Sequence, residues 1–449
     1  MNRFHNNTGQ FKPISYVSFI PQTNPIQFYT MKRRLLFCIS ALFSAAFSFS
    51  QKDYTLVVEG FDWGPAVSKV ILHLDNEISE NPDASAYQVL ATRTTDRTEN
   101  PITPSSGQRD VLSAYVSDAS GARTASGSNI TLILEVGPTL RISSPFHYQR
   151  GNFWVDYRLL ISNTQNLTTW DKETNRILPL VDNYDLTGVY NGANSQKEIH
   201  YASYSPKSGP TKKPLIIWLH GGGEGGTDTT IPLLGNRAAN YASDDIQNYF
   251  GAAYVLVPQS PTRWMDSGNG STSGQVDDIY FRDVKGLIEE FTSQHKDIDK
   301  DRIYVGGCSN GGYISFKLLL EYPDFFAGAY ISALAYRDSS VTDQQIKSIK
   351  HIPIWFVHSN DDTTTVPENT VLPIYKRLIS GGAKNVHLSY YDHVVDITNA
   401  YGGSNYHYPG HWSWIYSHAN ESYKDFDGKP VMVKGIPVTI MQWLALQRK

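Results

Sequence analysis

RIYVGGCSNGGY, residues 302–313, is the stretch that predicts the fold of this chain. A short run of β-branched and aromatic residues leads into Gly-x-Ser-x-Gly, formed by Gly307, Ser309 and Gly311, and a helical pattern follows over 313–320. Small residues two positions before and after Ser309 let a strand and a helix approach closely, and the strained turn between them exposes the serine hydroxyl. The stretch therefore predicts a strand, a sharp turn and a helix, with Ser309 as a candidate nucleophile.

A glycine-rich loop follows an earlier apolar strand. The strand PLIIWL, residues 214–219, runs directly into HGGGEGG, residues 220–226. Such a loop can be merely flexible, but the strand and His220 that lead into it favour one half of an oxyanion hole. We expect the backbone N–H groups of Asn310 and of Gly222, within the 221–223 stretch, to bind the oxyanion, and we expect His220 and Glu224 to support the loop.

A serine nucleophile needs a histidine to accept its proton and a carboxylate to orient that histidine. The apolar strand at 352–357 is followed by His358-Ser-Asn-Asp-Asp, so the next loop offers both Asp361 and Asp362. Further on, His411 lies in a tight Gly-His turn between aromatic residues. The sequence predicts a triad of Ser309, Asp362 and His411, with Asp361 as the alternative acid.

From roughly Lys197 to Lys449, these ordered motifs resemble α/β-hydrolase esterases of the group that includes polyhydroxybutyrate depolymerases, feruloyl esterases and prolyl-oligopeptidase-like hydrolases. The resemblance implies an α/β fold with a mostly parallel sheet and a two-step acyl transfer, which needs neither metal nor cofactor. Relatives usually place three residues between the acid and a proline. Here four separate Asp362 from Pro367, so the choice between Asp361 and Asp362 stays open.

The first residues predict export. Residues 1–30 have no apolar period, whereas a basic segment at 32–34, an apolar run at 35–49 and small residues before Ser50 are typical of a signal peptide at 31–50. The run is too short to span a membrane. We expect a secreted or periplasmic protein that loses Cys38 and keeps Cys308, which is either a reactive thiol or, as we favour, a small buried residue.

Composition excludes some partners. Residues 1–50 hold five Lys or Arg and no acid, so their removal leaves 34 basic against 43 acidic residues, a net charge of −9. Nucleic acid and an anionic membrane surface are therefore not expected as partners. The remaining 399 residues are long enough for two domains, and the oligomeric state stays open.

The first domain is predicted over residues 51–185 as an all-β sandwich. Short β-rich runs recur there, separated by turn-rich stretches, at 54–58, 69–74, 111–116, 129–136 and 153–160. The GFDWGP stretch at 60–65 resembles the start of the immunoglobulin-like module that precedes the catalytic domain in some bacterial esterases. Residues 163–195 are interpreted as a polar linker. The catalytic domain is predicted over 186–449, and the β-domain is expected to shape the cleft or hold the substrate rather than to supply chemistry.

Aromatic residues near the motifs offer candidate substrate contacts. Trp264, Tyr408, Trp412 and Trp414 can line a pocket or fill the core equally well, and we select Trp264 and Trp414 as substrate-binding. Together they favour an aromatic or carbohydrate-linked ester. The predicted function is hydrolysis of esters on plant polysaccharide or of small aryl or short-chain esters. The alternatives are a serine peptidase and a polyester depolymerase.

Overall fold

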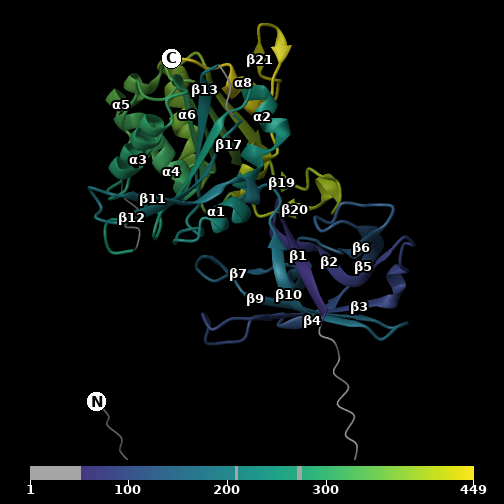
Figure 1. The fold of residues 1–449 in the computed structure, drawn as a ribbon. Coiled ribbons are helices and arrows are strands. Elements are labelled where there is room, and N and C mark those ends of the chain that lie inside the picture. The colour runs from purple at the N-terminus through teal and green to yellow at the C-terminus, as the bar shows by residue number, and fades with distance from the viewer. Residues whose placement is uncertain (1–51, 208–210, 271–275) are drawn as a thin grey trace, which may run out of the picture. The chain divides into compact units, whose positions relative to one another are not determined.

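The computed structural model describes residues 52–207, 211–270 and 276–449 (Figure 1). The predicted signal peptide at 31–50, including Cys38, lies outside the described residues. Across the described residues, none of the helices combines the length and the apolar character that crossing a membrane requires.

The N-terminal part is an eight-stranded sheet with the order β4-β3-β9-β10-β1-β2-β6-β5. Its strands are β1 (Lys52–Phe61), β2 (Gly64–Ile78), β3 (Tyr87–Thr94), β4 (Ser106–Arg109), β5 (Val111–Ser117), β6 (Gly127–Leu134), β9 (Asp156–Asn163) and β10 (Thr169–Ile177). A separate hairpin, β7 (Phe146–Tyr148) and β8 (Asn152–Trp154), lies between β6 and β9 in the chain.

This sheet folds over on itself. Arg109, at the end of β4, donates to the carbonyl oxygen of Val67 on β2 at 2.9 Å and to the hydroxyl of Tyr157 on β9 at 2.6 Å. Because β4 and β2 are five strands apart in the sheet and neighbouring strands lie about 4.8 Å apart, a flat sheet does not allow this bond. The two halves enclose a buried apolar core that includes Leu56 and Leu132. The predicted all-β sandwich is confirmed.

The predicted linker at 163–195 is wrong, because this stretch holds two strands. β10 lies between β9 and β1, and β11 (Asp185–Asn191) is an edge strand of the second sheet. In β10 only Trp170 is fully buried, and in β11 no side chain is. Their polar sequences therefore show no strand period, although backbone pairing with the neighbouring strands stabilises both segments as strands.

The C-terminal part has a second eight-stranded sheet, with the order β11-β12-β14-β13-β15-β16-β17-β18 (Figure 1). After β11, its strands are β12 (Glu198–Tyr204), β13 (Lys213–Leu219), β14 (Tyr254–Gln259), β15 (Ile298–Cys308), β16 (Gly328–Ser332), β17 (Ile354–Ser359) and β18 (Val386–Tyr391). The strands from β14 to β18 in this order run parallel, and β12 pairs antiparallel with both of its neighbours, β11 and β14. The predicted α/β fold with a mostly parallel sheet is confirmed.

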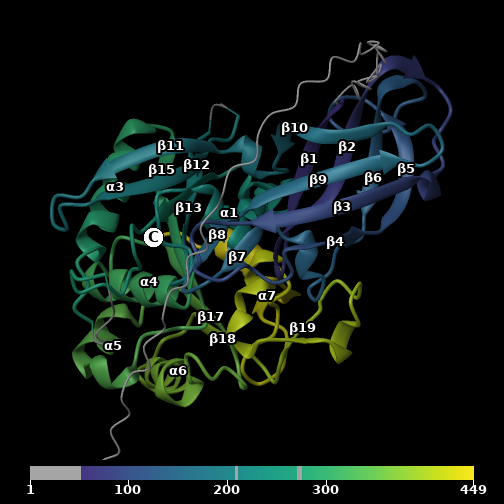
Figure 2. The same ribbon diagram turned by 90° about the horizontal axis from the view of Figure 1, so that it is seen from below.

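Helices cover both faces of this sheet (Figure 2). Alternation along β13 explains the layers, since Leu215 and Ile217 face one apolar cluster and Ile216 and Trp218 face the other. The first cluster includes residues of α3 (Phe281–Gln294), α4 (Asn310–Glu321), α5 (Asp343–Ile349) and α6 (Val371–Ser380). The second includes residues of α1 (Thr230–Gly235), α2 (Asp244–Phe250), α7 (Trp414–His418) and α8 (Ile440–Ala445). Two short hairpins complete the fold, β19 (Val394–Val395) with β20 (His407–Tyr408) and β21 (Met432–Val433) with β22 (Ile436–Pro437).

The sheet brings distant loops to one edge. β13, β15 and β17 are parallel, so their carboxyl ends lie side by side. The residues that follow these ends are His220, Ser309 and, three positions after β17, Asp362. This edge is where ligands bind in open α/β sheets.

Candidate active site

Ser309 lies on a strained turn between β15 and α4. Its backbone has φ 52° and ψ −114°, a conformation that a side-chain-bearing residue adopts at a cost. The flanking glycines have no room for a side chain, because a Cβ on Gly311 would lie 1.8 Å from the carbonyl oxygen of Leu219, and one on Gly307 would lie 2.5 Å from that of Gly311. The turn therefore depends on both glycines.

Gly311→Ala is expected to destabilise the protein by more than about 3 kcal/mol, because backbone atoms of β13 occupy the space that the new methyl group needs. Chemical denaturation measures the free energy of unfolding. Gly328→Ala is a matched control, since its Cβ would meet only side-chain atoms, the nearest at 3.4 Å. Equal stability of the two variants would contradict the steric argument.

Ser309, His411 and Asp362 form a continuous chain of hydrogen bonds. His411 Nε2 is 2.9 Å from Ser309 Oγ, and His411 Nδ1 is 2.9 Å from Asp362 Oδ2. His411 is 102 positions from Ser309 and 49 from Asp362 in the sequence; Ser309 and Asp362 follow β15 and β17, and His411 lies on the 3-10 turn Gly410–Trp412 after β20. Trp414 packs edge-on against the His411 ring at 5.3 Å between ring centroids. The structure thus brings together all three predicted triad residues.

Asp362 is buried in a set of donors. Its Oδ1 accepts the backbone N–H groups of Thr364 and Thr365 at 2.8 and 2.9 Å, and its Oδ2 accepts the Thr365 hydroxyl at 2.6 Å as well as His411. Burial alone would raise the pKa of Asp362, but hydrogen bonds from His358 and His411 outweigh it and hold this pKa well below its usual range. Asp362 is therefore ionised at neutral pH.

The alternative acid points elsewhere. Asp361 Oδ2 is 2.8 Å from His393 Nδ1, and its other oxygen accepts a hydrogen bond from Ser359. Of the two adjacent carboxylates, Asp362 is the one that contacts His411.

The two residues predicted to supply oxyanion donors lie close together. Asn310 is the first residue of α4, so its backbone N–H has no partner within the helix. A Cβ on Gly222 would lie 3.6 Å from the Asn310 Cβ, so the glycine loop runs past the start of this helix beside Ser309. The Asn310 side chain is used differently, since its Oδ1 accepts the backbone N–H of Met265 at 3.1 Å. Acyl-transfer sites use two backbone donors beside the nucleophile, and the roles of Asn310 and Gly222 as these donors stay predictions.

His220 supports the glycine loop. It is fully buried, its Nδ1 lies 2.6 Å from the Gly221 carbonyl oxygen, and its Nε2 accepts the Ser260 backbone N–H at 3.0 Å. Burial lowers the pKa of His220 to about 4, so the ring is neutral and donates from Nδ1. Its bonds are all to the backbone, as a structural role requires.

Glu224 links the loop to the N-terminal sandwich. Its Oε1 accepts from the Asn152 side chain at 2.9 Å, and the Asn152 backbone N–H donates to the Gly223 carbonyl oxygen at 2.7 Å. Burial raises the pKa of Glu224 to about 7, although hydrogen bonds from Asn236 and Asn152 oppose the shift. The glycine loop is thus bonded to His220 at Gly221 and to Asn152 of the sandwich at Gly223.

The raised pKa of Glu224 predicts a pH-dependent stability. Because the folded pKa lies above the ordinary value of 4.5, this contribution is fully present below pH 4.5 and is lost as the pH rises through 7. Glu224→Gln removes the ionisable group. Between pH 4.5 and 7 the free energy of unfolding of this variant should therefore rise, relative to that of the wild type, by roughly 3 kcal/mol at most. Denaturation at a series of pH values measures the difference, with the exposed Glu198→Gln as control. Parallel pH profiles for Glu224→Gln and the wild type would overturn the assignment.

A cavity of about 790 Å³ opens beside Ser309 and His411. The catalytic part contributes Gly221–Gly223, Glu224, Arg263, Thr364, Trp412 and Trp414 to its lining, and the sandwich contributes Asp62, Trp63, Arg93, Arg141, His147, Tyr148, Arg150 and Asn152, among others. Trp414 thus lines the cavity, and its contact with substrate stays a prediction.

Trp264 is not among the residues that line this cavity, and its predicted contact with substrate is wrong. The side chain is completely buried, donates from its indole N–H to the His220 carbonyl oxygen at 3.1 Å, and packs edge-on against Tyr280. It is therefore a core residue that fixes the strand leading into the glycine loop.

Cys308 is also fully buried, and burial raises the pKa of its thiol well above the usual value, as a structural cysteine requires. Among the described residues, no group of three or more His, Cys, Asp or Glu side chains is arranged to hold a metal ion.

Sequence reasoning missed the sandwich residues that line the cavity. Asn152 lies on a three-residue strand and Arg141 on a short turn, and neither carries a motif. The one available signal was the GFDWGP stretch, whose Asp62 and Trp63 do line the cavity.

Two family comparisons match parts of the chain. Residues 53–176 match the Esterase Ig-like N-terminal domain, and residues 262–343, which include Ser309, match the Prolyl oligopeptidase family. A solved structure described as a thermostable esterase is 23% identical, with a TM-score of 0.68 over 82% of this chain and 96% of that chain. The fold is thus an immunoglobulin-like domain followed by an α/β-hydrolase domain.

Curated relatives match shorter stretches. Poly(3-hydroxyalkanoate) depolymerase C of Paucimonas lemoignei is 27% identical over 154 residues, which is 32% of this chain and 34% of that protein. Feruloyl esterase B of Thermothelomyces thermophilus is 29% identical over 135 residues, 30% of this chain and 43% of that protein. The chain therefore spans about a third of the length of the first relative and less than half of the second.

Proposed function

We propose that this chain is a serine hydrolase that cleaves carboxylic esters through an acyl-enzyme. The observation that carries the proposal is the hydrogen-bonded chain from Ser309 through His411 to Asp362 at the edge of the cavity. The similarity of the chain to proteins named as esterases and depolymerases supports the same class of reaction.

In the first step, Ser309 Oγ attacks the ester carbonyl carbon while His411 Nε2 accepts the hydroxyl proton. The carbonyl oxygen gains the negative charge, which the backbone N–H groups of Asn310 and Gly222 bind, each such donor being worth about 2.7 to 4 kcal/mol. His411 then protonates the leaving alcohol. Water repeats the sequence on the acyl-enzyme and releases the carboxylic acid, while Asp362 stabilises the imidazolium in both steps.

The substrates that we propose are esters on plant polysaccharide or small aryl and short-chain esters. Trp412, Trp414 and Tyr148 place aromatic surface along the cavity, which suits a sugar or an aryl ring. We further propose that the protein is exported, on the basis of the predicted signal peptide at 31–50.

A panel of substrates tests this function. Acetylated xylan, feruloylated sugar, p-nitrophenyl acetate and a polyester are each incubated with the purified protein, and release of acid is measured. Turnover of at least one ester that disappears in Ser309→Ala supports the proposal. No turnover of any ester by folded protein would refute it.

A serine peptidase is the second candidate, because residues 262–343 match the Prolyl oligopeptidase family. Peptidases of this group use the same triad, so geometry alone does not separate the two. The ratio of kcat/KM for p-nitrophenyl acetate and for peptide p-nitroanilides does so. Faster cleavage of the anilides would replace the esterase proposal by this one.

A further inference from the structure

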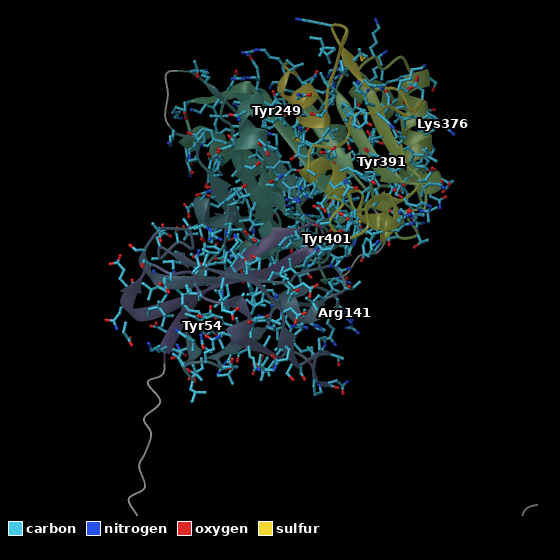
Figure 3. The ribbon with its side chains drawn as sticks, turned by 90° about the vertical axis from the view of Figure 1, so that its right-hand side faces the viewer. Tyr54, Arg141, Tyr249, Lys376, Tyr391 and Tyr401 are labelled. Carbon is cyan, nitrogen blue, oxygen red and sulfur yellow. The ribbon has the colours of Figure 1, made fainter. Side chains whose placement is uncertain are left out.

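Three basic side chains of the sandwich, two arginines and a histidine, line the active-site cavity. They are Arg93 on β3, Arg141 on the 3-10 turn Arg141–Ser143, and His147 on β7. Arg141 is exposed, and Figure 3 labels it on the sandwich. Arg93 is 3% exposed, and it donates from its two terminal nitrogens to the carbonyl oxygens of Phe146 and Pro104.

The three groups are close enough to repel one another. Burial lowers the pKa of His147, and the charges of Arg93 and Arg141 lower it further. In the same way, burial and the charge of Arg141 lower the pKa of Arg93. The Nε of Arg93 is buried and has no hydrogen-bond partner among the described residues. Burial keeps this Nε away from the cavity, so the exposed guanidinium of Arg141 is the one most open to a ligand.

The cavity contains little negative charge to compensate. Arg150 and Arg263 also line it, and within the described residues neither these two nor Arg93 and Arg141 form an ion pair. Of the two acidic residues in the lining, Asp62 is paired with Arg237 at 2.5 Å, and Glu224 has its pKa raised to about 7 by burial. The cavity is therefore cationic in a chain whose net charge is −4.

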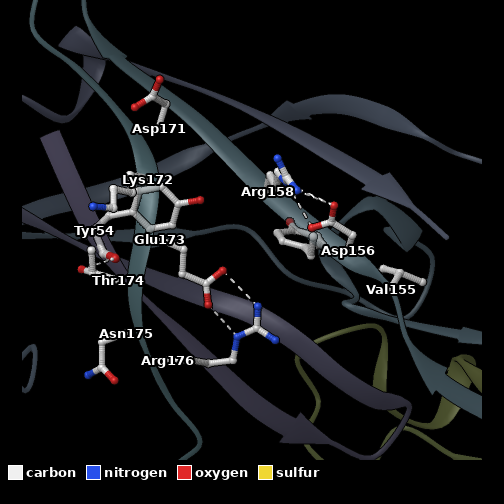
Figure 4. Close-up of a pocket in the computed structure, with 11 residues that line it drawn as sticks. Tyr54, Val155, Asp156, Arg158, Asp171, Lys172, Glu173, Thr174, Asn175 and Arg176 are labelled. Carbon is white, nitrogen blue, oxygen red and sulfur yellow. Dashed lines mark hydrogen bonds and ion pairs between the residues drawn. The ribbon is translucent and has the colours of Figure 1, made fainter. Parts of the chain in front are cut away.

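A second cavity of the same volume shows the opposite arrangement. It lies on the sandwich and is lined by 11 residues from Tyr54 and the 155–158 and 171–176 segments (Figure 4). Its arginines are neutralised, because Arg158 pairs with Asp156 at 2.9 Å and Arg176 with Glu173 at 2.8 Å. The arginines of this second cavity thus have carboxylate partners, which those of the active-site cavity lack among the described residues.

We propose that the active-site cavity binds esters that carry a separate carboxylate, which Arg93, Arg141 and His147 receive while the ester carbonyl lies at Ser309. A carboxylate satisfies several N–H donors at once, and an arginine fork binds it in a bidentate manner. The inference rests on the proposed function, because it names the substrate class of the same site.

Matched ester pairs test this inference in the full-length protein. One arm compares p-nitrophenyl hydrogen adipate and suberate with p-nitrophenyl hexanoate and octanoate, which places the carboxylate on the acyl part. The other compares 4-(acetoxymethyl)benzoate with 4-methylbenzyl acetate, which places it on the alcohol part. We expect kcat/KM to favour the carboxylate by about tenfold or more in at least one arm at low salt, and the preference to shrink in high salt.

Two variants separate recognition from general effects of charge. In Arg141→Gln the preference ratio should fall toward one, whereas Arg158→Gln, an exposed arginine in the other cavity, should keep the ratio of the wild type. Arg150→Gln removes a second positive charge from the cavity lining and should also lower the preference ratio. Hydrolysis of the neutral esters with no carboxylate preference in either arm would overturn this inference and leave the esterase proposal intact. A preference that survives both cavity variants would also overturn it, while failure to hydrolyse any ester would refute the proposed function itself.

Discussion

Ser309→Ala is expected to lower ester turnover by about 10⁴ to 10⁶-fold, because it removes the attacking oxygen and leaves only binding and the oxyanion donors. The fold should survive, since a single hydroxyl is lost and the glycines of the turn remain. Steady-state hydrolysis of p-nitrophenyl acetate measures the loss, and circular dichroism measures the fold. A fluorophosphonate probe, which reacts with activated serines, should label the wild type and not the variant.

Ser348→Ala is the matched control for this experiment. Ser348 lies on α5 and donates to the Gln345 carbonyl oxygen, outside the lining of the cavity. Its turnover should stay within about twofold of the wild type, as expected of a substitution away from the site. A folded Ser309→Ala protein with the activity of the control would exclude Ser309 as the nucleophile.

Asp362→Asn should reduce kcat by about 10⁴-fold, because an amide at this position does not hold His411 in the tautomer that accepts the serine proton. Asp361→Asn should cost less than about tenfold, since Asp361 contacts His393 and Ser359 instead. The pair is well matched: the two substitutions are chemically identical and adjacent. If Asp361→Asn proved to be the more damaging, Asp361 would be the acid.

The low pKa of Asp362 adds a pH criterion to this comparison. A carboxyl whose folded pKa is depressed contributes stability that is present above its unfolded pKa and is lost as the pH falls through the folded pKa. Unfolding of the wild type should therefore become easier in acid below about pH 4, to a greater extent than unfolding of Asp362→Asn. Acid titration followed by tryptophan fluorescence measures the two curves, and identical curves would contradict the assignment.

Two members of the triad were predictable because they follow apolar strands, whereas His411 was selected from its Gly-His turn between aromatic residues. Ser309 and Asp362 come directly after runs whose period and β-branched residues indicate buried strands, and parallel strands deliver such loops to one edge. The sequence left Asp361 and Asp362 open, because the direction of a side chain in a loop depends on donors such as the Thr364 and Thr365 backbone, which no spacing rule describes.

The errors share a physical cause. β10 fully buries only Trp170, so its apolar period is missing and only pairing with β1 and β9 shows that it is a strand. Trp264 and Trp414 both lie near motifs, but one is in the core and the other lines the cavity, a difference that tertiary packing decides. The role of the sandwich in the cavity was likewise hidden, because it depends on the hairpin that carries Asn152 meeting a loop 72 residues further along the chain.

The bonds from Asn152 to Gly223 and Glu224 have a consequence for how such a protein can be rearranged. A replacement β-domain without an amide side chain at the position of Asn152 would lose the bond to Glu224 that supports the glycine loop, even if the core of that domain were stable. Chimeras between homologues should therefore be soluble but hydrolyse esters slowly. Transferring the β7–β8 hairpin together with the glycine loop should restore their turnover. The hairpin and the glycine loop would then have to be exchanged together, although they belong to different domains.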